Sequence, residues 1–270
     1  MDIIQAAAGK TLIAAHRGVA GGNIPCNTLT AYQAALLQGA DMIELDVSRA
    51  KDGTLYCFHP RMERVFLRSD RFIPEMTREE IDQLRLYNQD ATITQFPVPH
   101  LEDALNLLRG KCYINIDKFW DWPKEIGELI RRLGMQDQVL VKTAADPACF
   151  KAVEEVAADL PYMIITRDTD PYSETLLKRP LRYAGAEVLF AQDTAPVAQP
   201  DYIQWMHDHG LIVWANAIVY NHKTQLTGGH SDDIAVNNQM DEGWGWLLDR
   251  QFNIIQTDWP GMLKAYMNKR

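Results

Sequence analysis

The chain has 270 residues, of which 47% are hydrophobic and 23% are charged, and its formal net charge is −9. This composition provides enough apolar material for a large buried core and excludes a disordered or fibrous protein. The acidic balance argues against nonspecific nucleic-acid binding, because a protein that neutralises phosphates needs a basic surface.

The beginning of the chain carries no basic leader followed by a long apolar core. This predicts a cytoplasmic location for the chain as given, although an export signal already removed would leave no trace. No apolar run approaches the roughly 20 residues that span a bilayer, so we expect no stable membrane insertion. The four cysteines have no paired spacing, which favours free thiols over a disulfide framework or a zinc site.

Short β-rich runs alternate with amphipathic helical segments along the whole chain. Apolar residues at helical spacing predict helices at 28–39, 101–110, 122–134, 146–160, 199–210 and 260–270. The predicted strands are 11–16, 41–47, 112–117, 138–143, 162–167, 187–192, 211–218 and 252–258. Strand followed by helix, repeated over about 250 residues, predicts an α/β protein with a (β/α)8 TIM barrel. A doubly wound open sheet is the main rival, and it usually has fewer strands.

One segment interrupts this alternation. After the second strand, residues 51–53 (KDG) form a turn signal and residues 54–59 read as a further strand, which predicts a hairpin. An irregular polar stretch follows and ends near residue 98. We therefore expect a single TIM-barrel domain over residues 1–270, with a small insertion at about 50–98.

Three carboxylates occupy inward-facing positions of two predicted strands. Side chains of a strand alternate, so Glu44 and Asp46 share one face of the strand 41–47, and Asp117 ends the strand 112–117. The carboxyl ends of barrel strands open on the active site. An oxygen-only cluster suits one hard divalent cation, Mg²⁺ or Ca²⁺, better than zinc. The alternative is that the strands are half-solvated and the three acids merely face water.

Two histidines and an arginine are predicted close to these acids. His16 and Arg17 end the first strand, and His59 ends the strand of the insertion. A cation together with an arginine offsets negative charge on phosphoryl oxygens, while one imidazole takes a proton and the other gives one. The combination favours phosphoryl-transfer chemistry. For any single histidine, a hydrogen-bonded structural role is the alternative.

The motifs that carry these residues recur in a familiar order. They are AHRG at 15–18, NT at 27–28, GADMIELDV at 39–47, KDG at 51–53, FH at 58–59, PHLEDAL at 99–105, YINIDK at 113–118, VWANAI at 213–218 and NIIQTDWP at 253–260. Together they resemble the glycerophosphodiester phosphodiesterase family, a group of metal-dependent (β/α)8 barrels. The resemblance covers nearly the whole chain.

The resemblance implies an enzyme, a phosphoric diester hydrolase that cleaves glycerophosphodiesters to an alcohol and glycerol 3-phosphate with one divalent cation. In that family the glycerol hydroxyl next to the phosphoryl group is thought to attack first, which gives a cyclic phosphate that water then opens. The implied roles are acid–base catalysis for His16 and His59, metal binding for Glu44, Asp46 and Asp117, and phosphate binding for Arg17 and Lys118.

Two positions depart from the family pattern. Cys26 stands where relatives usually have a glutamate, and Pro60 follows His59 where they usually have an aspartate. These departures keep two alternatives open: a phosphodiesterase acting on sugar phosphodiesters or on lysophospholipids with cyclic-phosphate formation, and a barrel that binds a phosphoryl ligand without turning it over. A separation of His59 from His16 would favour the second.

Three further residues are expected to line the pocket. Lys142 shares an inward face where many relatives have a small polar residue, and either adds positive charge for an anionic group or extends its ammonium to solvent. Trp214 and Asn216 lie on the seventh strand, where Trp214 forms either a wall for a glycerol or sugar moiety or part of the core. The long segment 220–239 predicts a substrate lid with a hinge at Gly228 and Gly229. The released alcohol, the choice of metal and the oligomeric state do not follow from these motifs.

Overall fold

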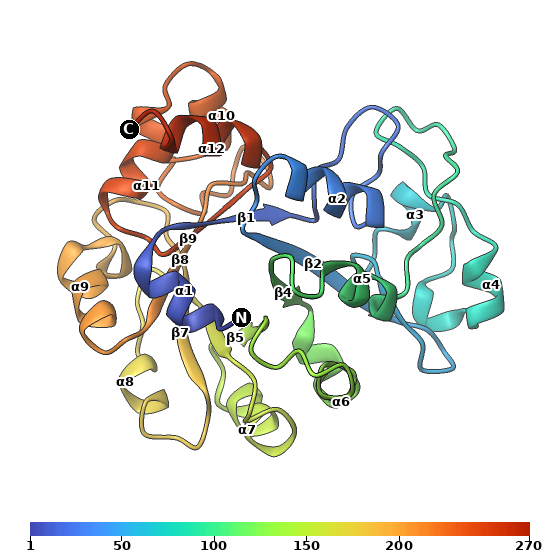
Figure 1. Ribbon diagram of the computed structural model, residues 1–270, viewed down its shortest axis with the longest axis horizontal. Coiled ribbons are helices and arrows are strands. Elements are labelled where there is room, and N and C mark those ends of the chain that lie inside the picture. Colours follow the sequence, from blue (N-terminus) through green and yellow to red (C-terminus); the bar gives the residue numbers. More distant parts are fainter.

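The computed structural model describes residues 1–270, and its centre is a closed ring of eight parallel strands with helices around it (Figure 1). Hydrogen-bonded neighbours follow the order β1-β9-β8-β7-β6-β5-β4-β2, and the pairing of β1 with β2 closes the ring. The predicted TIM barrel is therefore confirmed. Its strands are β1 (Leu12–His16), β2 (Met42–Arg49), β4 (Tyr113–Asp117), β5 (Val139–Ala144), β6 (Tyr162–Arg167), β7 (Tyr183–Leu189), β8 (Ile212–Asn216) and β9 (Ile254–Thr257).

The helices begin where local chemistry satisfies or removes their free N–H groups. The hydroxyl of Thr28 accepts a hydrogen bond from the Ala31 N–H (3.1 Å) at the start of α2, and four other helices begin with proline, which has no N–H to satisfy. None of the helices has the length and apolar character needed to cross a bilayer. They are α1 (Ile3–Gly9), α2 (Leu29–Leu37), α3 (Glu63–Phe66), α4 (Arg78–Asp82), α5 (Leu101–Leu108), α6 (Pro123–Arg132), α7 (Pro147–Val156), α8 (Ser173–Leu176), α9 (Pro200–Asp208), α10 (Asp232–Val236), α11 (Trp246–Asp249) and α12 (Pro260–Met267).

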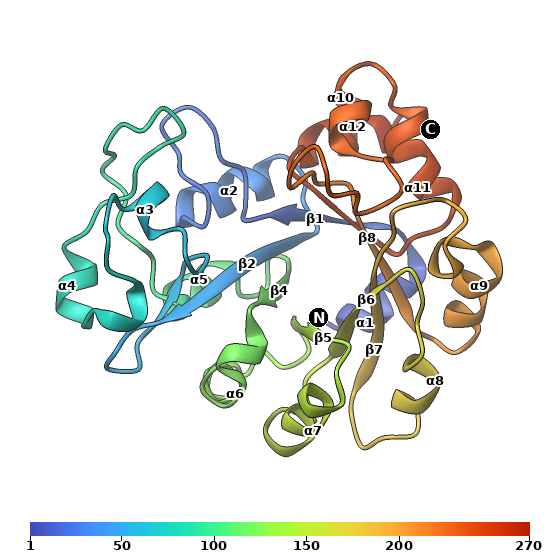
Figure 2. The same ribbon diagram turned by 180° about the vertical axis from the view of Figure 1, so that it is seen from behind.

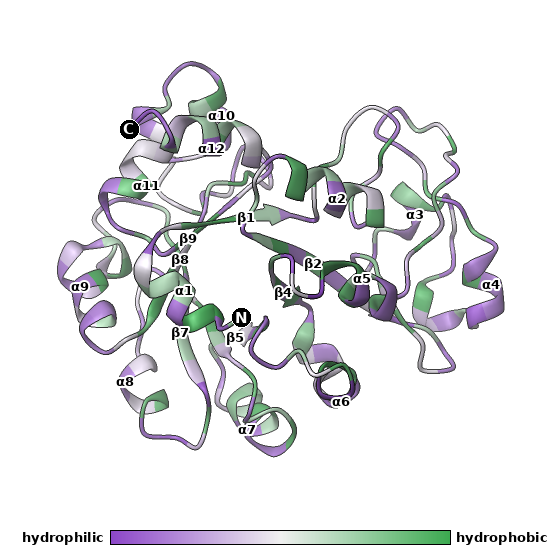
Figure 3. Cartoon of the chain, viewed as in Figure 1, coloured by the Kyte–Doolittle hydropathy of each residue, from purple (hydrophilic) through white to green (hydrophobic).

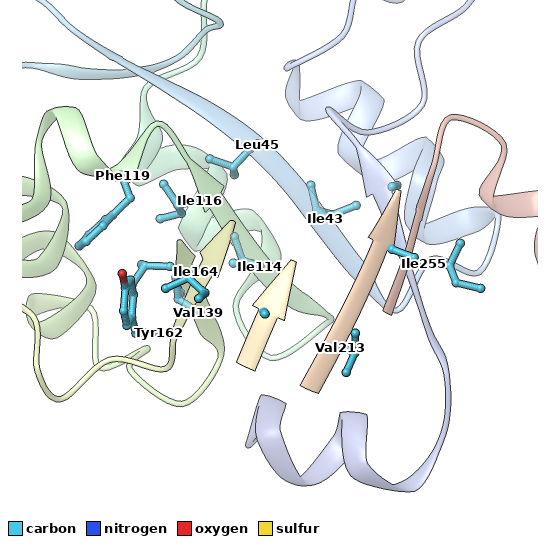
Figure 4. Packing of buried hydrophobic residues seen from close by; sticks show 14 of the residues in the cluster. Ile43, Leu45, Ile114, Ile116, Phe119, Val139, Tyr162, Ile164, Val213 and Ile255 are labelled. Atoms are coloured by element: carbon cyan, nitrogen blue, oxygen red, sulfur yellow. The ribbon is translucent and has the colours of Figure 1, made fainter. Parts of the chain in front are cut away.

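Apolar side chains form two layers, one outside and one inside the ring of strands. The outer layer packs the strands against the helices, and Figure 4 shows part of it around Ile43, Leu45, Ile114 and Ile116. Outer helices such as α5 and α6 are amphipathic and carry both hydropathy colours in Figure 3. Because successive side chains of a strand alternate, this outward apolar face leaves the opposite face of each strand for the barrel interior.

The interior layer fills the amino-terminal half of the barrel, and α1 covers the barrel at the amino-terminal ends of the strands. Ile3 and Ala7 of α1 are fully buried against inward side chains that include Met42, Leu140 and Trp214. Both views show α1 within the outline of the ring (Figures 1 and 2). The carboxyl half of the interior is therefore the part that remains for polar side chains.

The strand predicted at 187–192 lies earlier, at Tyr183–Leu189. The prediction was wrong because Ala184 and Gly185 have low β propensity, so the apolar signal begins late. Gly185 has a φ of +144°, and a Cβ added to it would lie 1.9 Å from the Ile212 carbonyl oxygen of β8. The glycine thus marks a point where two backbones approach closely.

The insertion begins as a hairpin and then forms a small core of its own. Strand β3 (Leu55–Cys57) pairs antiparallel with the end of β2, as the KDG turn predicts. Short helices follow, and nine buried side chains between residues 50 and 98 cluster together. This part projects to one side beyond α2 and α5 (Figure 2). The organisation of the whole chain as one domain stays a prediction.

We expect Gly185→Ala to destabilise the protein by about 3 kcal/mol, because the new methyl group must displace the β8 backbone. The free energy of unfolding in urea measures this effect. Gly21→Ala is the matched control, since a Cβ at that position meets no atom within 4 Å. Equal stability of the two variants would show that β7 and β8 can separate without loss.

Candidate active site

A cavity of about 200 Å³ lies at the carboxyl ends of the strands, and two of the predicted acids, Glu44 and Asp117, line it. Glu44 and Asp46 come from β2 and Asp117 from the neighbouring β4, where Asp46 and Asp117 are register partners. One oxygen from each of the three carboxylates lies within 4.8 Å of the others, and all three residues are buried. The structure thus brings the three together, out of contact with bulk water.

The geometry of this cluster fits a hard cation. Asp46 Oδ1 is buried and has no hydrogen-bond partner, while Asp46 Oδ2 accepts a hydrogen bond from Asn27 Nδ2 at 2.8 Å. Burial and the charge of Asp46 raise the pKa of Glu44 to about 7. Burial acts in the same direction on Asp117, but the charges of Lys142 and Lys118 hold the pKa of that carboxyl below its usual value. Buried, closely spaced oxygen ligands of this kind suit Mg²⁺ or Ca²⁺.

Two residues with left-handed backbones hold the acids in place. Arg17 (φ 57°) donates its backbone N–H to Glu44 Oε2 at 3.1 Å, and Asn27 (φ 54°) donates its own N–H to the Arg17 carbonyl at 2.9 Å. The Asn27 side-chain oxygen accepts from the Asp46 N–H and from the Tyr32 hydroxyl. Asn27 is thus a positioning residue to which the sequence analysis gave no role, although its NT motif marked the place.

Both histidines lie beside the acid cluster, and the same ring nitrogen of each is held by a hydrogen bond. Nδ1–H of His16 donates to Asp258 Oδ1 at 2.8 Å, and Nδ1–H of His59 donates to the Pro60 carbonyl at 2.8 Å. Each Nε2 is therefore left for chemistry. Nε2 of His59 lies 3.9 Å from Asp46 Oδ1, and His16 is the register partner of Glu44.

The environments of the two imidazoles shift their pKa values in opposite directions. Burial would lower the pKa of His16, but the hydrogen bond to Asp258 and the charge of Glu44 raise it above its usual value. Burial lowers the pKa of His59, and the charge of Asp46 offsets this only in part. The pair is therefore chemically unequal, which suits one acid and one base.

Asp258 owes its position to a buried carboxylate behind it. Asp232 accepts hydrogen bonds from the Asp258 N–H (2.8 Å), the Thr257 hydroxyl (2.7 Å) and the indole N–H of Trp244 (2.7 Å). These three bonds fix the turn after β9, so Asp258 reaches His16. The TD motif at 257–258 marks the place of Asp258 in the sequence, but it predicts neither the contact of Asp258 with His16 nor the role of Asp232.

Arg17 and Lys118 supply positive charge at the rim of the acid cluster. Arg17 Nε lies 2.8 Å from Asp46 Oδ2, and Lys118 contacts Asp117 and lies 3.9 Å from Asp46 Oδ1. Both also line the cavity. Two cations beside a buried anionic cluster can hold the oxygens of a phosphoryl group next to a bound metal ion.

Lys142 lies inside the barrel and is paired. Its ammonium donates to Glu187 Oε2 at 2.6 Å, and only 3% of the residue is exposed, so it does not extend to solvent. Burial would lower the pKa of Lys142, but Glu187, Asp117 and Glu44 raise it. Asn216 lines the cavity as predicted, whereas the fully buried Trp214 belongs to the interior core beneath it. The bulky ring points into the apolar layer, which corrects the expectation that it lines the pocket.

The segment after β8 borders the cavity through Tyr220 and Leu226. Gly228 is held by its N–H, which donates to the Phe190 carbonyl at 2.9 Å, and a Cβ there would lie 2.4 Å from Asp193 Oδ1. The positive φ of this glycine therefore serves close packing against the 190–193 segment. Lid movement stays a prediction.

Comparisons with known proteins indicate the family of the chain. The glycerophosphoryl diester phosphodiesterase family matches residues 16–261. A glycerophosphodiester phosphodiesterase of Bacillus altitudinis is 33% identical over 145 residues, which cover 49% of this chain and 58% of that protein. One from Caldanaerobacter subterraneus is 43% identical over 75 residues, 28% of this chain and 30% of that protein. The chain thus spans less than two thirds of the length of these curated relatives.

Solved structures share the fold over nearly all of the chain. A glycerophosphoryl diester phosphodiesterase from Parabacteroides distasonis superimposes with a TM-score of 0.78 at 19% identity, covering 96% of this chain and 87% of that one. An Oleispira antarctica phosphodiesterase in complex with the product sn-glycerol-3-phosphate gives a TM-score of 0.70 at 17% identity and covers 97% and 99%.

The raised pKa of Glu44 predicts how stability depends on pH when metal is removed. Between about pH 4.5 and 7 the unfolded chain ionises this carboxyl while the folded protein keeps its proton, so stability falls as pH rises. The loss is on the order of 3 kcal/mol. With chelator present, Glu44→Gln should remove this part of the pH dependence of urea unfolding.

Glu128→Gln, on the exposed face of α6, is the control and should keep the wild-type pH dependence. Identical pH profiles for wild type and Glu44→Gln would mean that the acid cluster tolerates its charge without a cation.

Proposed function

Because this chain belongs to the glycerophosphoryl diester phosphodiesterase family, we propose that it hydrolyses glycerophosphodiesters to an alcohol and glycerol 3-phosphate. The reaction uses one divalent cation, Mg²⁺ or Ca²⁺, and acid–base catalysis by His16 and His59. The observation that carries the proposal is that two imidazoles with free Nε2 atoms lie beside three buried, closely spaced carboxylates. This arrangement matches the needs of phosphoryl transfer.

Each group of site residues has a separate proposed role in the reaction. A cation held by Glu44, Asp46 and Asp117 would offset negative charge on the phosphoryl oxygens. Arg17 and Lys118 bind and orient those oxygens from the rim. One histidine takes the proton of the attacking glycerol hydroxyl through Nε2, and the other gives a proton to the oxygen of the leaving alcohol, which leaves a cyclic phosphate. Water then opens the ring: its proton goes to one histidine and the freed glycerol oxygen receives a proton from the other, which gives glycerol 3-phosphate.

The two departures from the family pattern are compatible with turnover. The partner of His59 Nδ1 is the backbone carbonyl of residue 60, which a proline supplies as well as an aspartate does. Burial raises the pKa of the Cys26 thiol to about 11, so this residue stays neutral beside Arg17. Arg17 then keeps its charge for Asp46 and the substrate. These contacts favour catalysis over a barrel that only binds a phosphoryl ligand.

The test is release of alcohol from glycerophosphodiesters, sugar phosphodiesters and lysophospholipids, with Mg²⁺, with Ca²⁺ and with chelator. We expect metal-dependent turnover of glycerophosphodiesters, and a loss of about 10²–10⁴ in kcat for His16→Ala and for His59→Ala, because each removes a proton-transfer group.

His209→Ala is the control, since this histidine lies at the end of α9 and donates only to the Trp205 carbonyl. Turnover confined to lysophospholipids or to sugar phosphodiesters would show that these compounds, and not glycerophosphodiesters, are the substrates. Cation binding with no turnover of any diester would favour the ligand-binding alternative.

A further inference from the structure

One wall of the cavity is built from strands β5, β7 and β8. Each contributes one inward polar side chain, Lys142, Glu187 and Asn216 respectively, and all three line the cavity. Lys142 donates to Glu187 Oε2 at 2.6 Å, and Asn216 Nδ2 donates to Glu187 Oε1 at 2.7 Å. The indole of Trp214 donates to Asn216 Oδ1 at 3.1 Å and carries the Lys142 ammonium 4.8 Å above its ring. The trio is therefore held rigidly.

This trio keeps unused hydrogen-bonding capacity. An ammonium has three N–H donors and each carboxylate oxygen has two lone pairs, so the bonds within the trio leave both donors and acceptors free. A buried ion pair is a poor source of stability compared with apolar side chains of the same size. Groups that are costly to bury and not fully satisfied, in the wall of a cavity, indicate recognition of a ligand.

The free groups match hydroxyls better than an anion. Glu187 compensates the charge of Lys142 and would repel a second phosphate or carboxylate, so the trio does not form an anion site. A hydroxyl donates and accepts at once and fits a mixed array of donors and acceptors. Four apolar residues also line the cavity and suit the carbon skeleton of a small polyol: Ile165, Leu189, Ile218 and Leu226.

Burial decides which end of a substrate reaches this wall. The three residues are between 3% and 6% exposed, whereas Trp120 and Tyr220, which also line the cavity, are 36% and 58% exposed. The buried end of the cavity, at the trio, suits a small group of fixed size such as glyceryl. The exposed end, at Trp120 and Tyr220, can accommodate alcohols of different sizes. The glyceryl group therefore belongs at the trio.

We propose that Lys142, Glu187 and Asn216 determine specificity by binding the terminal hydroxyl of the glyceryl group, the hydroxyl that does not neighbour the phosphoryl oxygen. The proposal rests on the proposed hydrolysis of glycerophosphodiesters and adds how this chain selects glycerol.

The test compares two p-nitrophenyl phosphodiesters, one of glycerol through its primary oxygen and one of 1,2-propanediol through its primary oxygen. Both keep the hydroxyl next to the phosphoryl group, and only the glycerol ester has the terminal hydroxyl. We expect the wild type to prefer the glycerol ester by at least about 10-fold in kcat/KM, the effect of one hydrogen bond to a charged group. Glu187→Gln should reduce this ratio, and the apolar double variant Lys142→Met/Glu187→Leu should bring it close to 1.

Lys178→Met/Glu174→Gln, which removes an exposed ion pair on the surface, is the control and should keep the wild-type ratio. A wild-type ratio retained by the double variant overturns the proposal. If the wild type cleaves neither ester, the proposed function fails. The role of the trio is then tested by calorimetry, which compares the affinities of the wild type and the double variant for glycerol 3-phosphate and for 1,2-propanediol 1-phosphate. The same binding comparison serves any variant that is inactive: a lost preference supports the trio, and a kept preference overturns it.

Discussion

The mouth of this barrel is organised around the repulsion between three buried carboxylates. Like charges a few ångströms apart in a medium of low dielectric constant oppose one another strongly. Arg17, Lys118 and Lys142 reduce this repulsion from three different strands or loops, yet Asp46 still keeps an oxygen without a partner. The site is therefore incomplete in electrostatic terms until a cation or a positively charged group enters it, and the surrounding residues are placed to leave that room.

The barrel accommodates such a site because its interior is divided along its axis. Apolar side chains and α1 fill the amino-terminal half, and ionisable side chains fill the carboxyl half. A strand contributes to both halves through successive inward positions along its length, as Met42 and Glu44 do on β2. The apolar half supplies rigidity, and the hydrogen bonds of Asn27, Asp232 and Asn216 extend that rigidity to the groups proposed for chemistry.

The sequence predicted features that depend on local pattern and missed those that depend on register. Alternation located Glu44, Asp46 and Asp117, and strand ends located His16 and His59. The partnership of Lys142 with Glu187 spans 45 positions in the chain, and that of His16 with Asp258 spans 242. No periodicity encodes such pairs, because they exist only once the ring closes. Trp214 was ambiguous for the same reason, since its depth along the barrel axis is set by neighbouring strands.

His59 differs from the other site residues in the part of the fold that positions it. Its companions stand on barrel strands or on the short turns after them, whereas His59 follows β3 in a segment whose apolar side chains pack mainly among themselves. Such an arrangement is modular. Over evolutionary time the segment can be lengthened, shortened or exchanged between relatives without repacking the barrel, provided that its hairpin keeps its register with β2. Half of the proposed proton-transfer pair can then be inherited separately from the carboxylates proposed to bind the metal.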